Sequence, residues 1–251
     1  MTDSLIGPGA GSEVVGSVLG QMPPRDTTAL VRGVRDRIRL AIILGEIPGG
    51  SRLNQVQLAK QLGVSRMPVR TATAELATEG LLEIVPGGGV TVRLLTAKDL
   101  RDVYEVRVAL ESRAVRHVAE RQPPWGLARI EQIVATHKPR VPTYGAAAML
   151  EADRDFHMAI LDATENSFFR QAIVPVWSTV ERAMVQLLHM EGVFTRAWDE
   201  HERIAAALRA GDPDLAELRI REHLDNAAAE LATVLPDSGD AHSVVAGGGT
   251  Q

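Results

Sequence analysis

The chain has 251 residues, no cysteine, aromatic residues at only 4% and a formal net charge of −5. Without cysteine there is no disulfide framework and no thiolate metal site, and a reducing, cytoplasmic setting fits. No apolar run approaches the roughly 20 residues that a membrane-spanning helix needs, and the N-terminus lacks the pattern of a secretion signal, so we expect no membrane partner. A composition rich in Leu, Ala and Arg predicts a mainly α-helical protein of one large or two modest domains.

Charge is unevenly distributed along the chain. Residues 28–95 contain nine Lys or Arg and five Asp or Glu, a balance of +4, whereas the rest contains 18 basic and 27 acidic side chains, a balance of −9. A basic segment joined to an acidic body indicates that attraction to phosphate groups is confined to one end of the molecule.

The first segments read as a tail followed by a helix. Residues 1–25 are rich in Gly, Ser and Pro, and we predict that they are disordered. Apolar residues at helical spacing then predict a helix over 28–44, which Gly45 and a Pro-Gly turn bring to an end.

Residues 55–84 have the pattern of two short helices joined by a tight turn. Gly63 suits the left-handed residue that ends the first helix, and Ser65 stands at the N-cap of the second. This pattern predicts a helix-turn-helix, in which the N-terminal end of the second helix enters the major groove of DNA. The exposed side chains at that end are expected to be those of Ser65, Arg66, Met67 and Arg70.

Two short strands are predicted after the helix-turn-helix. Residues 82–85 and 90–92 alternate in polarity around a Pro-Gly-Gly-Gly turn, which predicts a strand–turn–strand wing. The tip at Gly88 brings no charge, but glycine allows a close approach to a DNA backbone or minor groove. Phosphate contacts are therefore expected from Arg52, Arg66 and Arg70, with Arg35 or Arg93 as further candidates.

The stretch GVSRMPVRTATAELATEGLLEI resembles the recognition segment of the GntR family of bacterial transcriptional regulators. That family usually shows Gly-Val-Ser-Arg-Thr-Pro-Val-Arg-Glu-Ala, so Met67 and Thr71 depart from it and indicate a shifted base preference. The resemblance implies a winged helix-turn-helix DNA-binding domain over 26–95. The alternative is that Ser65 only caps a helix and the arginines are solvated, but the ordered pattern favours DNA binding.

Thr96 reads as the N-cap that opens a second, all-helical domain over 96–235. Residues 236–251 turn polar and Gly-rich again and are predicted to form a disordered tail. Breaks at Pro, Gly and Asn divide the second domain into six predicted helices, near residues 97–121, 125–137, 143–163, 167–190, 194–210 and 213–234.

Four polar side chains lie on apolar faces of these helices. Asp153 and His157 are four residues apart and share a face, and His201 and His223 lie on apolar faces of two later helices. Burial without partners costs roughly 1–3 kcal/mol per neutral polar group, and one divalent cation would resolve all four. Imidazole and carboxylate ligands suit Zn²⁺ first, and also Ni²⁺, Mn²⁺ or Fe²⁺. Taken singly, each histidine is more often an ordinary residue, and Asp153–His157 also fits an ordinary i,i+4 pair.

A second resemblance concerns this domain. The segments YEVRVALESRAVRHVAE, DRDFHMAILDATEN, HERIAAALRAGD and REHL resemble the FadR C-terminal domain, called FCD, and six helices resemble its VanR-type branch. Metal-binding members of that family use an Asp, a His four residues later and two further histidines, positions that Asp153, His157, His201 and His223 match. The resemblance also implies a cavity above the metal that accepts a small carboxylate effector.

Two residues are assigned to that cavity. Arg107 lies on an inward stripe where an apolar side chain is expected, so it either pairs with Glu111 or Asp153 or binds the effector carboxylate. The resemblance favours the second role. Asn166 is placed in the same cavity, although capping the next helix explains it equally well.

The sequence therefore predicts a homodimeric DNA-binding regulator, most often a repressor in this family, that presents two winged units to a two-fold symmetric operator. A carboxylate-type effector at the metal site would control DNA binding. Two alternatives stay open: a metal-dependent, hydrolase-like enzyme using the His₃Asp site, and a regulator whose metal only braces the bundle. No further base or nucleophile accompanies the four ligands, so a non-enzymatic role is favoured.

Overall fold

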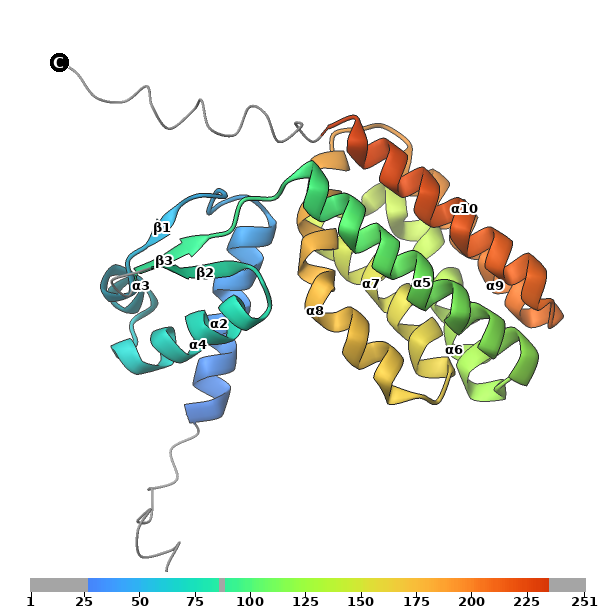
Figure 1. Ribbon diagram of the computed structural model, residues 1–251, viewed down its shortest axis with the longest axis horizontal. Helices are drawn as coiled ribbons and strands as arrows, with labels where there is room; N and C mark the ends of the chain where they lie inside the picture. The colour runs from blue at the N-terminus through green and yellow to red at the C-terminus, as the bar shows by residue number, and fades with distance from the viewer. Residues whose placement is uncertain (1–26, 86–88, 235–251) are drawn as a thin grey trace, which may run out of the picture.

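The computed structural model describes residues 27–85 and 89–234, and within these ranges the apolar side chains pack into two separate hydrophobic cores. The smaller core belongs to an N-terminal unit of helices and a small sheet, and the larger one to a bundle of helices at the other end of the molecule (Figure 1). The predicted tails and the wing tip at Gly88 lie outside the described residues.

The N-terminal unit is a winged helix-turn-helix, as predicted. Its antiparallel sheet has the strand order β1-β3-β2, and Val90 in the middle strand pairs with Leu53 and with Ile84. Val69 and Leu76 are fully buried and belong to the smaller hydrophobic core. The elements are α2 (Thr27–Ile43), β1 (Arg52–Leu53), α3 (Gln55–Leu62), α4 (Arg66–Thr78), β2 (Leu82–Val85) and β3 (Gly89–Val92).

Local sequence fixes the turn that separates α3 from α4. Asn54 caps α3 by accepting hydrogen bonds from the backbone N–H groups of Val56 and Gln57 at 3.0 and 3.1 Å. Gly63 ends α3 in the left-handed region with φ +67°. Ser65 occupies the N-cap of α4 with an extended backbone, but its hydroxyl makes no capping hydrogen bond.

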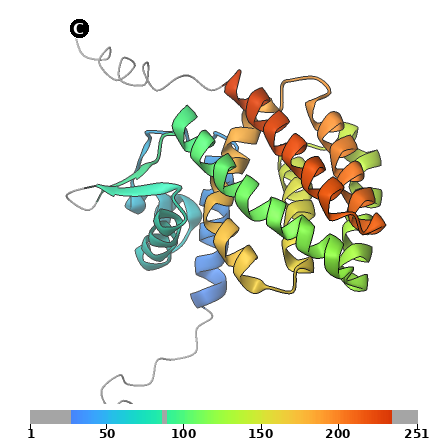
Figure 2. The same cartoon turned by 45° about the vertical axis from the view of Figure 1, so that its right-hand side comes forward.

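Residues 97–234 form six α-helices and two short 3₁₀ segments. The helix α5 begins with a capping box, in which Thr96 and Asp99 bond reciprocally to each other's backbone N–H groups. The helices α5 and α10 lie side by side along the bundle (Figures 1 and 2). The elements are α5 (Ala97–Arg121), α6 (Pro124–His137), η1 (Lys138–Thr143), α7 (Ala146–Ala163), α8 (Ser167–Met184), η2 (Val185–Leu187), α9 (Val193–Ala210) and α10 (Pro213–Ala232).

Two helix boundaries differ by three residues or more from those expected. The helix expected over 143–163 starts only at Ala146, because Pro139 and Pro142 lie in the preceding 3₁₀ segment and proline cannot donate a helical hydrogen bond. The helix expected over 167–190 ends at Met184, where the chain tightens into η2. No helix in the described ranges is long and apolar enough to cross a bilayer.

The two units touch where α8 meets α2 and the end of α4 (Figure 2). Ser178 Oγ donates a hydrogen bond to the backbone carbonyl of Glu79 at 3.2 Å. Arg182 Nη2 donates to the backbone carbonyl of Arg93 at 2.8 Å. The helix α8 of the bundle therefore contacts the N-terminal unit through several polar side chains.

Glu181 carries the buried charge of this contact, and its side chain is only 6% exposed. Arg39 of α2 pairs with one carboxylate oxygen, and Arg154 Nη1 lies 3.7 Å from the other. Burial raises the pKa of Glu181 in spite of these two cations. The ion pairs therefore do not fully offset the desolvation of the carboxylate.

Replacing Arg39 with alanine is expected to lower the free energy of unfolding by about 1–3 kcal/mol, because it leaves Glu181 buried beside a single, more distant cation. Glu181→Gln removes the buried charge itself and is expected to cost less than Arg39→Ala. Urea unfolding measures both changes. Arg37→Ala, an exposed arginine on the same helix, is the control, and equal losses in the two arginine variants would contradict the prediction.

Candidate metal centre

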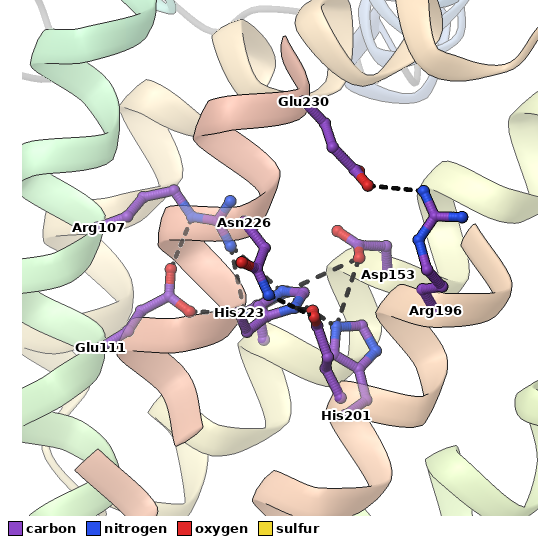
Figure 3. Close-up of polar contacts among 10 residues, drawn as sticks. Arg107, Glu111, Asp153, Arg196, His201, His223, Asn226 and Glu230 are labelled. Atoms are coloured by element: carbon purple, nitrogen blue, oxygen red, sulfur yellow. Dashed lines mark hydrogen bonds and ion pairs between the residues drawn. The ribbon is translucent and has the colours of Figure 1, made fainter. Parts of the chain in front are cut away.

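Three imidazole rings converge in the core of the bundle. His157 of α7, His201 of α9 and His223 of α10 are buried and offer ring nitrogens that all lie within 4.8 Å of one another. The Nε2 atoms of His201 and His223 are 3.3 Å apart (Figure 3). Tetrahedral Zn²⁺ with bonds of about 2.0–2.1 Å holds its ligand atoms about 3.3 Å apart, so this spacing suits one shared cation.

Asp153 adds a carboxylate from one turn before His157 on α7. Its Oδ1 lies 3.9 Å from His157 Nε2 and 3.7 Å from His201 Nε2. Its Oδ2 is buried and has no hydrogen-bond partner among the residues that the structure describes. Three imidazole nitrogens and a carboxylate with spare lone pairs form a donor set suited to a divalent cation. The fold thus brings together the four side chains that the sequence selected.

Two further carboxylates orient the imidazoles from outside the cluster. Glu111 Oε2 lies 2.5 Å from His157 Nδ1, and Glu200 Oε2 lies 2.8 Å from His223 Nδ1. These acceptors favour the ring proton on Nδ1, which leaves Nε2 of each ring as an acceptor. Nε2 of His223 lies against His201, and Nε2 of His157 also lies 3.2 Å from Arg107 Nη2. Asn226 Nδ2 in turn donates to Glu200 Oε1 at 2.7 Å (Figure 3). Sequence reasoning missed Glu200, although it directly precedes His201 in the chain.

The burial of the rings keeps them in the form that binds metals. Burial lowers the pKa of His201 well below its ordinary value and also lowers that of His223, so both are neutral at pH 7. His201 has no hydrogen-bond partner for Nδ1 in the described chain and instead stacks on Phe156, with ring centroids 4.0 Å apart. A cation needs no proton displaced from these two rings at neutral pH.

Arg107 is paired with an acid, one of the two roles that the sequence left open. Its Nε donates to Glu111 Oε1 at 2.7 Å, and its Nη2 lies 3.2 Å from His157 Nε2. Burial alone would raise the pKa of Glu111, but the interactions of its carboxylate with Arg107 and His157 outweigh burial and lower that pKa to about 2. Arg107 also lines a cavity beside the cluster, so contact with an effector stays a prediction.

The cavity beside the cluster has a volume of about 30 Å³ and a mixed wall. Its polar side is formed by Tyr104, Arg107, Asp153, His223 and Glu230, and the rest is apolar. A groove of about 360 Å³ between α9 and α10 shares His223 and Glu230 with it. An ion pair of 2.8 Å joins Arg196 and Glu230 there (Figure 3).

Asn166 is not brought to this cavity. It occupies the N-cap of α8, where its Oδ1 accepts a hydrogen bond from the backbone N–H of Phe168 at 3.1 Å. Asn166 lines neither the cavity nor the groove between α9 and α10. Local helix capping therefore accounts for Asn166, the second of the two roles that the sequence left open.

The side chains selected for DNA contact lie at the far end of the molecule from this cluster. Arg52 lies on β1, which pairs with β3 at the base of the wing. Arg35 is partly neutralised, because it bonds to Asp36 at 2.8 Å and lies 3.9 Å from Glu75. The four residues at the start of α4 are all exposed, namely Ser65, Arg66, Met67 and Arg70.

Replacing Glu200 with glutamine is expected to weaken Zn²⁺ affinity about 10- to 100-fold, because the imidazole of His223 loses the charged acceptor that orients it. Competition with a chromophoric chelator at neutral pH measures the affinity. Glu202→Gln removes the same charge from the same helix, where Glu202 bonds only to the exposed end of Lys138, and serves as the control. Wild-type affinity in the Glu200 variant would refute the orienting role.

The metal-free protein is expected to lose stability in acid. The folded pKa of His201 lies well below the ordinary value of 6.5, so the unfolded chain takes up a proton first as the pH falls. Above pH 6.5 His201 is neutral in both the folded and the unfolded chain, and it does not lower the free energy of unfolding. Below pH 6.5 the unfolded chain binds the proton more readily, so the free energy of unfolding falls. Urea unfolding of chelator-treated protein from about pH 7.5 to about pH 5 should show a smaller loss in His201→Ala than in wild type. His189→Ala, an exposed histidine outside the cluster, should follow wild type.

Comparisons with known proteins agree with this architecture. Residues 30–92 match the family described as bacterial regulatory proteins, gntR family, and residues 102–226 match the FCD domain. The probable D-xylose utilization operon transcriptional repressor of Paenarthrobacter nicotinovorans is 31% identical over 206 residues, which cover 78% of this chain and 86% of that protein. The putative L-lactate dehydrogenase operon regulatory protein of Escherichia coli is 29% identical over 215 residues, covering 76% and 82% of the two chains.

Solved structures show the same fold. The putative GntR regulator of Rhodococcus sp. RHA1 superposes with a TM-score of 0.72 at 23% identity, covering 83% of this chain and all of that one (100%). Escherichia coli McbR/YncC superposes with a TM-score of 0.70 at 22% identity, covering 81% and 97% of the two chains. With its gntR-type helix-turn-helix, its FCD domain and a relative of 31% identity, the chain belongs to the GntR family of transcriptional regulators.

Proposed function

We propose that the protein is a homodimeric, cytoplasmic repressor of the GntR family whose operator binding is controlled by a small carboxylate bound beside a divalent metal ion. The observation that carries the sensing half is the convergence of Asp153, His157, His201 and His223 next to a cavity. When bound, the ion would supply a Lewis-acidic centre for a carboxylate oxygen.

The DNA-binding half of the proposal rests on the exposed start of α4. Arg66 and Arg70 are exposed one turn apart, and no ion pair within the described ranges involves either of them. The hydroxyl of Ser65 is likewise not used for capping. These side chains are therefore available for base edges and phosphates in a major groove. A two-fold symmetric dimer would present two such helices to a symmetric operator.

The charges around the cavity explain why a cation would be needed for an anionic effector. Among the side chains that line the cavity, Arg107 contributes one positive charge, Asp153 and Glu230 each contribute a negative one, and the neutral His223 adds none. The protein alone therefore offers a carboxylate a formally negative site. A divalent ion held by Asp153 and the histidines would reverse that sign.

The relatives do not identify the effector. Their names refer to D-xylose utilization, an L-lactate dehydrogenase operon and a gluconate operon. The effector of this chain has to be inferred from its own cavity. The hydrolase-like alternative has less support, because the nearby carboxylates of Glu111 and Glu200 are already bonded to His157 and His223 and are not free to act as a base.

Arg66→Ala is expected to weaken binding to a duplex selected from a random library by about 5- to 100-fold, as loss of a base contact predicts. Fluorescence anisotropy at fixed salt measures the dissociation constant. Arg101→Ala removes the same charge from an exposed position on α5 and should leave the constant unchanged. Equal weakening by the two variants would show that only net charge matters.

Small carboxylic acids are expected to raise the melting temperature of Zn²⁺-loaded protein and to leave chelator-treated protein unaffected, because only the cation reverses the charge of the cavity. A thermal-shift screen measures this response. His201→Ala should abolish it, and His189→Ala should retain it. An equal rise in melting temperature without metal would contradict the metal-dependent part of the proposal.

A further inference from the structure

The histidine cluster is closed off from solvent, so a cation needs a route to reach it. The three histidines are at most 3% exposed. The ring of Phe156 stacks on His201 with centroids 4.0 Å apart, and Trp198 lies 4.9 Å from the same histidine. Trp177 lies 5.4 Å from His157. These three aromatic side chains are themselves fully buried, so a cation cannot pass them without a large rearrangement of the core.

The side of the cluster toward α9 and α10 has a thinner wall. There the cavity of about 30 Å³ and the outer groove of about 360 Å³ are lined in part by the same residues. Ala197 of α9 and Ala227 of α10 belong to this shared wall and carry only a methyl group each. A single layer of side chains therefore separates the groove from the cavity. The shared residues are Val193, Ala197, His223, Ala227 and Glu230.

The charges along this line favour a cation. Glu230 lines both the groove and the cavity, and its side chain is 28% exposed. In the groove, Glu200 and Glu230 are negative and Arg196 is positive, so the groove carries a net negative charge. On the inner side, Asp153 lines the cavity, and its buried Oδ2 has no hydrogen-bond partner among the residues that the structure describes. A carboxylate therefore stands at each end of the passage.

Arg196 occupies the outer carboxylate. Its Nη2 lies 2.8 Å from Glu230 Oε1 (Figure 3). The side chain of Arg196 is 58% exposed, and ion pairs with such exposed partners are weak. Arg196 can therefore swing into solvent at little cost and release Glu230 for another cation.

We infer that the groove between α9 and α10 is the route by which a divalent cation enters and leaves the cluster. Glu230 is the carboxylate that binds the cation on its way, and Arg196 is the side chain that keeps this carboxylate occupied. Glu230 is thus a transient ligand and not a member of the cluster. This inference rests on the metal site of the proposed function and adds to it the path of the ion.

The test measures the rates of Zn²⁺ uptake and release by the full chain, using stopped-flow mixing with a chromophoric chelator. Glu230→Gln is expected to slow both rates about 3- to 30-fold, because a neutral amide attracts the passing cation less. Arg196→Gln is expected to speed both rates, because it frees Glu230 and removes a repelling charge. A change in the barrier acts in both directions, so the Zn²⁺ affinity should change much less than either rate.

A second ion pair on α10 provides the matched control. Arg221 Nε lies 3.0 Å from Glu217 Oε1, and neither residue lines the groove or the cavity. The side chain of Glu217 is 26% exposed, close to the value for Glu230. Glu217→Gln and Arg221→Gln are expected to keep both wild-type rates. All four variants lie at the surface and are expected to melt with wild type after chelator treatment.

The outcomes separate this inference from the proposed function. If Zn²⁺ binds but either groove variant keeps the wild-type rates, the inference fails and the metal site stands. Equal slowing by Glu217→Gln overturns it as well, since net charge alone then sets the rates. Faster release with unchanged uptake in Glu230→Gln would show a permanent ligand and would also overturn it. If wild type takes up no Zn²⁺, the metal-dependent part of the proposed function fails together with the inference.

Discussion

A set of buried polar side chains at the centre of the helical unit constrains how its helices pack, because several of these side chains bond to one another across helices. His157 and His223 are each held by a carboxylate from a different helix, Glu111 on α5 and Glu200 on α9. Arg107 then neutralises part of the charge that this arrangement buries. Because the two carboxylate–imidazole bonds join separate helices, they help to fix how α5 packs against α7 and how α9 packs against α10. Apolar side chains make up most of the buried residues, whereas the polar network favours one particular packing of the helices.

Much of the architecture can be predicted from the sequence, because it depends on local sequence rules. The spacing of apolar residues predicts the helices. Gly63 marks the end of α3 and Ser65 the start of α4, and Thr96 marks the start of the first helix of the bundle. The sequence also reveals Asp153 and His157 as a pair, because they are four residues apart on an apolar helix face. The two later histidines join them only through the family resemblance, since no local pattern relates helices that are tens of residues apart in the chain.

The features that escaped prediction depend on long-range contact. The sequence does not single out Glu200 or Glu181, because nothing in the residues next to them in the chain shows that His223 or Arg39 will approach them. Asn166 is the opposite case, because a local rule, the capping of its own helix, explains a residue that the family resemblance places in a distant cavity. The domain boundaries at residues 26, 96 and 235 and the roles of the individual ligands stay predictions.

The helix α8 carries contacts to both halves of the molecule within a single turn. Glu181 and Arg182 face the DNA-binding unit, and Met184 lines the cavity. A cavity of about 30 Å³ accommodates a few water molecules at most, so a larger guest has to push its wall outward. In the proposed sensor, a rigid α8 would pass such a displacement to the partners of Glu181 and Arg182. The size of the effector, and not only its charge, would then change how the bundle holds the N-terminal unit.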